Sequence, residues 1–66
     1  MKYKILKQFS MIPYTVLLLD AAERVQPGSS AFIDGQYYAS AGLCDQPHSA
    51  AILGAGSFVG KEIVFA

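Results

Sequence analysis

The dipeptide Asp34-Gly35 constrains the fold of this chain more than any other feature of its sequence. It stands between two short runs of apolar and aromatic residues, Ala31-Phe32-Ile33 and Gln36-Tyr37-Tyr38. A type I′ turn needs positive φ at both central residues, which Asp tolerates and Gly adopts readily, so the pattern predicts a two-residue β-hairpin. The expected register has three cross-strand pairs: Ile33 with Gln36, Phe32 with Tyr37, and Ala31 with Tyr38.

The size and composition of the chain predict one small, association-prone domain. A chain of 66 residues supports a single core, so we expect residues 1–66 to form a single small β domain. Hydrophobic residues make up 53% and charged residues 15% of the chain, against roughly 25% charged residues in ordinary domains. A domain of this size cannot hide so many apolar side chains, so we expect some of them to face another copy or another protein.

The segment from Lys2 to Phe9 has the alternation of a half-buried strand. Its three lysines favour an edge strand protected from aggregation, with a phosphate-binding patch as the alternative. The alternation predicts two faces, with Tyr3, Ile5, Lys7 and Phe9 on one and Lys2, Lys4 and Leu6 on the other.

The apolar run that follows Pro13 is compatible with either a strand or a helix. Thr15 and Val16 prefer strands, so we expect a strand at 13–19 and a polar turn at 20–24. The alternative is a helix at about 14–25, because Pro13 suits a first helical position and an apolar helical face would form. That face would consist of Leu18, Ala21, Ala22 and Val25.

The rest of the chain has the turn residues and short apolar runs that are typical of a small β protein. We expect a turn at Val25–Ser29, a loop at Ala39–Ser49, and further strands within Ala50–Leu53 and Ser57–Phe65. The predicted fold is therefore all-β, a small five- to six-stranded antiparallel barrel or strongly bent sheet of SH3-like or OB-like size. The alternative is an α+β fold with the helix at 14–25.

Glycines 54, 56 and 60 follow an apolar run, as in dinucleotide-binding loops. That chemistry needs a following helix, a second parallel strand and an acidic residue about twenty positions later. Only six residues follow Gly60, so we interpret these glycines as a hairpin or strand bend and expect no cofactor.

Cys44 and His48 bring a thiol and an imidazole close together in the sequence. A thiol-dependent enzyme is therefore one hypothesis for the function. One Cys and one His supply two strong ligands, short of the four of a structural zinc site, and so small a chain has little room for a pocket. We expect an ordinary loop here, with no metal, no enzymatic activity and no small-molecule substrate.

Four tyrosines and four phenylalanines give the chain its candidate binding residues. We expect a non-enzymatic protein–protein interaction module that forms a homo-oligomer or binds a protein partner through apolar strands and surface tyrosines. Its predicted anchors are Tyr14, Phe32, Tyr37, Tyr38 and Phe58. The alternative is a small barrel that binds single-stranded nucleic acid, which a net charge of zero disfavours. Its residues would be Lys2, Lys4, Lys7, Tyr37 and Tyr38.

The sequence also bears on location. The basic start and the apolar stretch after Met11 resemble a signal peptide, but Pro13 and Tyr14 interrupt the stretch, so we expect a structural element instead. No apolar run approaches the roughly 18 residues that span a bilayer. The single cysteine suits a reducing compartment, so a cytoplasmic protein is expected.

Overall fold

A computed structural model of the protein describes residues 2–23, 25, 28–41 and 48–66. Over these residues the chain forms one antiparallel sheet of six strands and no helix, which confirms the all-β prediction. The strands are β1 (Lys2–Met11), β2 (Tyr14–Asp20), β3 (Ser30–Ile33), β4 (Gln36–Ala39), β5 (Ser49–Leu53) and β6 (Glu62–Phe65). Their order across the sheet is β4-β3-β6-β1-β2-β5.

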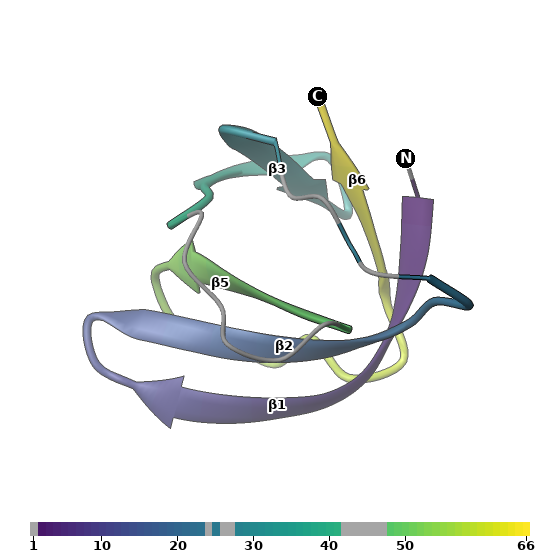
Figure 1. The fold of residues 1–66 in the computed structure, drawn as a ribbon. Coiled ribbons are helices and arrows are strands. Elements are labelled where there is room, and N and C mark those ends of the chain that lie inside the picture. Colours follow the sequence, from purple (N-terminus) through teal and green to yellow (C-terminus); the bar gives the residue numbers. More distant parts are fainter. Residues whose placement is uncertain (1, 24, 26–27, 42–47) are drawn as a thin grey trace.

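The sheet is strongly bent, so that its two halves lie on opposite sides of one core (Figure 1). Just after the end of β4, Ser40 forms an isolated bridge with Ile52 of β5, and the Ala41 N–H donates to the Ala51 carbonyl at 2.9 Å. The bend buries apolar side chains from five of the strands and from the segment before β6. The largest fully buried side chains are Ile5, Leu17, Leu19, Ile33, Ile52 and Ile63, and the rings of Phe58 and Phe65 are buried with them.

The predicted hairpin is present with the expected register. Asp34 and Gly35 have φ of 52° and 75°, as the two central residues of a type I′ turn require. Ile33 pairs with Gln36, and Phe32 pairs with Tyr37. Local turn chemistry therefore sets the alignment of β3 and β4.

Strand β2 covers Tyr14–Asp20, so the predicted strand is confirmed and the alternative helix at 14–25 is wrong. Hydrogen bonding on both sides of the segment decides between the two, because β2 lies between β1 and β5. The described residues contain no helix with the length and apolarity needed to cross a bilayer.

Strand β1 differs from its prediction in two ways. It lies between β6 and β2, so the expected edge strand is wrong. A bulge between Ile5 and Lys7 then shifts the register, because one extra residue reverses the side-chain alternation beyond it. Ile5 is buried as predicted, whereas Phe9, expected on the same face, is exposed.

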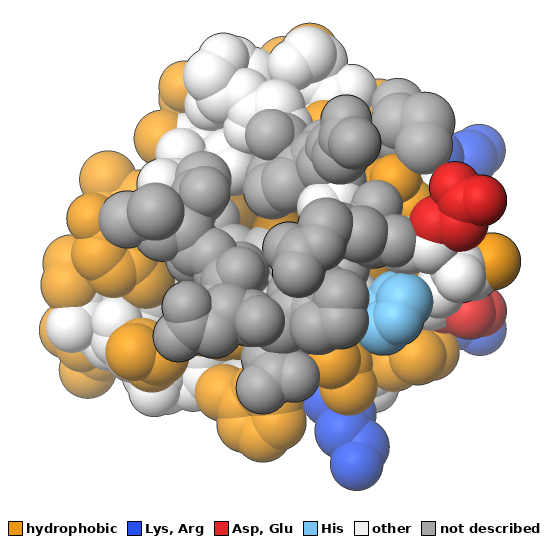
Figure 2. Space-filling view, viewed as in Figure 1, with side chains coloured by type: hydrophobic (Ala, Val, Ile, Leu, Met, Phe, Trp, Pro, Cys, Tyr) orange, Lys and Arg blue, Asp and Glu red, His pale blue; other side chains and the backbone are white. Residues whose placement is uncertain are grey.

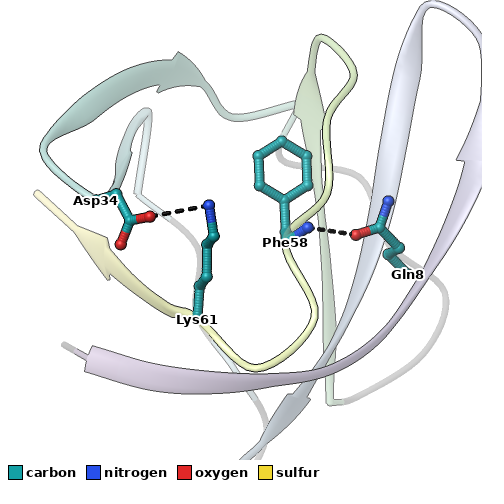
Figure 3. A network of polar contacts seen from close by, with 4 residues as sticks. All are labelled: Gln8, Asp34, Phe58 and Lys61. Carbon is teal, nitrogen blue, oxygen red and sulfur yellow. Dashed lines mark hydrogen bonds and ion pairs between the residues drawn. The ribbon is translucent and has the colours of Figure 1, made fainter.

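The last strand is shorter than the predicted Ser57–Phe65, because β6 begins at Glu62. Gly60 has a φ of +88° and the chain turns there. Before the turn, Phe58 is buried, and its backbone N–H donates to the side chain of Gln8 (Figure 3). The turns expected at Val25–Ser29 and Ala39–Ser49 lie partly outside the described residues.

Candidate interaction surfaces

The outer face of the β1–β2 hairpin and β5 carries a group of exposed apolar side chains. Beyond the bulge, direct cross-strand partners align in two rows that point away from the core: Phe9–Val16–Ala51 and Met11–Tyr14–Leu53. Ile12 extends this group at the turn between β1 and β2. We call this surface the hairpin face and define it by Phe9, Met11, Ile12, Tyr14, Val16 and Leu53.

The hairpin face is large for a chain of this size. Its large side chains other than Val16 are exposed by between 41% at Tyr14 and 90% at Ile12. Taking about 200 Å² as the full surface of a large side chain, these fractions amount to roughly 600 Å². The largest apolar patch on a typical monomer is about 300–600 Å² and is often functional. Figure 2 shows hydrophobic side chains gathered on the side where the β1–β2 turn lies.

Two hollows lie on either side of Val16 on this face. The described residues that line the first, of about 220 Å³, include Met11, Tyr14 and Ala51. Those that line the second, of about 420 Å³, include Phe9, Met11 and Leu18. Ile12 projects beside them, so the same surface has both a protruding apolar side chain and apolar hollows.

Charge is sparse around the hairpin face. The next cross-strand row toward the bulge consists of Lys7, Leu18 and Ser49, of which Lys7 is exposed and Ser49 is buried. Among the described residues, the face therefore has one lysine at this border and apolar side chains over its centre, which is the composition of an interface core.

A second surface lies on the other half of the sheet. Four residues on neighbouring strands form a line across the sheet, each the direct cross-strand partner of the next: Tyr37 on β4, Phe32 on β3, Val64 on β6 and Lys2 on β1. All four side chains are exposed. The rings of Phe32 and Tyr37 meet edge to face, with centroids 5.8 Å apart and planes at 65°. We call these four residues the aromatic row.

Charged side chains border the aromatic row. Lys61 Nζ lies 2.9 Å from Asp34 Oδ2, and Lys2 Nζ lies 3.9 Å from Glu62 Oε2 (Figure 3 shows the first pair). Both pairs are solvent-exposed, so each contributes little to stability. Together with Phe32 and Val64 they line an open hollow of about 660 Å³.

The five predicted anchors occupy three different places. Tyr14 belongs to the hairpin face, whereas Phe32 and Tyr37 belong to the aromatic row. Tyr38 and Phe58 pack against each other, with ring centroids 5.3 Å apart and planes at 85°. Phe58 is 3% exposed and Tyr38 is half-buried against the core, so neither ring forms part of the two exposed surfaces.

The residues predicted for nucleic-acid binding are also divided. Lys2 and Tyr37 share the aromatic row. Lys4 lies two residues further along β1, where it is the cross-strand partner of Glu62. Lys7 lies beyond the bulge at the border of the hairpin face, and Tyr38 packs inward. Sequence reasoning missed Phe32 and Lys61 for this site, because strand pairing and the Asp34 turn bring them beside Lys2.

Cys44 lies outside the described residues, so the predicted thiol–imidazole pair is not placed. His48 is half-buried, and its backbone carbonyl accepts a hydrogen bond of 2.7 Å from the Leu19 N–H. Within the described part of the chain, no three His, Cys, Asp or Glu side chains form a group suited to a metal ion.

Comparison with protein-family models, with curated proteins and with solved structures gives no match for this chain.

Proposed function

We propose that this protein is a non-enzymatic interaction module that self-associates through the hairpin face. The observation that carries the proposal is a contiguous apolar surface on β1, β2 and β5, formed by exposed side chains on adjacent strands. We propose the cytoplasm as its compartment, because a single cysteine suits reducing conditions.

A second copy of the chain fits this surface. In a two-fold dimer each copy presents the same patch, so a protruding group on one copy must find a hollow on the same patch of the other. Ile12 is such a protruding group, and the hollows beside Val16 are apolar. The hairpin face therefore has both a projecting side chain and apolar hollows, which a two-fold contact between copies needs.

The size and charge of the molecule also favour this pairing. A stable interface buries about 800 Å² on each partner. The hairpin face supplies roughly 600 Å² of that as apolar surface, and its polar border supplies the rest. The formal net charge is zero, so two copies approach without long-range repulsion.

Sedimentation equilibrium over a dilution series tests the proposal. We expect a mass of twice 7.1 kDa at micromolar concentrations, falling toward the monomer on dilution. A monomer mass at every concentration would overturn it.

A charged substitution in the interface gives the sharper comparison. Ile12→Lys places a charge at the most exposed apolar position of the hairpin face, and we expect it to produce a monomer. Val59→Lys is the matched control, since Val59 is an exposed apolar residue in a turn away from this face, and we expect it to remain dimeric. Equal effects of the two substitutions would contradict the assignment of the interface.

A further inference from the structure

The aromatic row places two exposed rings and a lysine side chain along one line across four strands. Tyr37, Phe32, Val64 and Lys2 are direct partners, so they point to the same side of the sheet. Three strand spacings separate Tyr37 from Lys2, which is about 14 Å. Lys61 reaches the same surface from the turn before β6, where it meets Asp34.

We propose that the aromatic row, together with Lys61, binds single-stranded nucleic acid. Bases stack on exposed aromatic rings whatever their sequence, and lysines beside the rings hold the phosphates. Phe32 and Tyr37 supply two neighbouring rings, and Lys2 and Lys61 supply the cations on the border of the hollow. This surface lies on β4, β3, β6 and the first part of β1, away from the hairpin face, so a dimer leaves it free.

The acidic partners of the two lysines set the strength of binding. Asp34 and Glu62 neutralise Lys61 and Lys2 in the free protein. Both pairs are exposed and contribute little to stability, so a phosphate can compete for the lysines, while the displaced carboxylates stay nearby and repel it. The site is therefore weak and salt-dependent, and removal of either acidic charge strengthens it.

The two rings favour nucleic acid over an acidic peptide. A row of lysines alone would attract any polyanion, but an acidic peptide gains nothing from a neighbouring pair of exposed rings. Stacking on an aromatic side chain is worth about 1–3 kcal/mol per base, which is a factor of about 5 to 150 in affinity. The loss of affinity when Tyr37 is replaced therefore distinguishes nucleic acid from an acidic peptide as the ligand.

The test is a titration of the full chain with a fluorescein-labelled oligothymidylate of about ten nucleotides, followed by anisotropy at low salt. The protein has no tryptophan, so its emission comes from four tyrosines, and stacking on Tyr37 quenches part of it. We expect saturable binding with quenching of tyrosine emission. With two phosphates neutralised, affinity falls about five-fold between roughly 50 and 150 mM salt.

Two substitutions and one control define the site. Tyr37→Leu weakens binding at least about five-fold and reduces the quenching, whereas the matched control Tyr14→Leu on the hairpin face leaves the affinity unchanged. Asp34→Asn strengthens binding several-fold, because it frees Lys61 while Asn preserves the turn conformation. A gain of affinity in this variant cannot result from loss of folding.

The proposal is overturned by the absence of any anisotropy change at low salt, by equal affinities of the Tyr37→Leu and wild-type proteins, or by an Asp34→Asn variant that binds no better. Competition by polyglutamate as strong as competition by unlabelled oligothymidylate would assign the surface to acidic peptides instead.

The titration is repeated with Ile12→Lys. Unchanged affinity per chain supports a site that is separate from self-association, and loss of binding contradicts it.

Discussion

The side-chain oxygen Oε1 of Gln8 accepts a hydrogen bond of 2.6 Å from the backbone N–H of Phe58, fifty residues away in the chain (Figure 3). The amide nitrogen of the same side chain donates to the Gly56 carbonyl at 2.7 Å. The oxygen and the nitrogen of the Gln8 side-chain amide therefore both hold the segment before β6 against β1. This attachment directs the Phe58 ring under Tyr38 and makes a predicted surface anchor part of the core.

Loss of this link destabilises the fold. Gln8→Ala leaves the Phe58 N–H without its partner in a half-buried site, and we expect the free energy of unfolding to fall by about 1–3 kcal/mol. Urea denaturation followed by circular dichroism measures the change. Gln36→Ala, at an exposed position of β4, is the control and should cost less than about 0.5 kcal/mol. Equal losses in the two variants would contradict the role of Gln8.

The Asp34-Gly35 turn depends on its backbone angles. Gly35→Ala introduces a side chain at a φ of +75°, and we expect a loss of about 1–2 kcal/mol although no atom lies within 4 Å of the new Cβ position. Asp34→Asn keeps a residue that accepts positive φ and removes only an exposed ion pair, so its cost should stay below about 1 kcal/mol. Thermal unfolding of both variants checks the difference, and a costlier Asp34→Asn would contradict it.

Ala66 lies against Gly28 so closely that no side chain fits there. A Cβ at Gly28 would clash with the backbone oxygen of Ala66, whose N–H donates to the Ser30 carbonyl at 3.0 Å. We expect Gly28→Ala to reduce the free energy of unfolding by about 1–3 kcal/mol.

A double-mutant cycle with removal of Ala66 identifies the cause of this loss. If the clash is responsible, Gly28→Ala should cost less in the shortened chain than in the full chain. The same cost in both chains would show that the contact with Ala66 is not the reason.

The parts of the fold that local chemistry determines could be predicted from the sequence. The Asp34-Gly35 turn sets its own register, because both central residues require positive φ. The apolar run after Pro13 is ambiguous by itself, since hydrogen bonds from β1 and β5 select the strand. The central position of β1 likewise depends on pairing with β6 and β2, which are distant from one another in the sequence.

The hairpin face is less predictable than the strands, because it depends on the bulge in β1. One extra residue between Ile5 and Lys7 turns Phe9 and Met11 outward, and simple alternation cannot show it. Phe58 stands in an apolar run that has the pattern of a strand, and the turn at Gly60 with the Gln8 contact places it in the core. The exposed pair of Phe32 and Tyr37 follows from the hairpin register, which the turn residues predict. No register is predictable for β2, so the sequence does not show that Tyr14 lies beside Met11 and Leu53.

The most direct test of the hairpin face as the self-association interface is a dilution series of ¹⁵N amide spectra of the full chain. We predict concentration-dependent shifts of the amide signals of Phe9, Met11, Ile12 and Tyr14, and of Leu53, the cross-strand partner of Tyr14. The amide signals of Phe32 and Val64 should keep constant positions. Spectra that stay unchanged over the whole series, or shifts centred on the aromatic row, would contradict it.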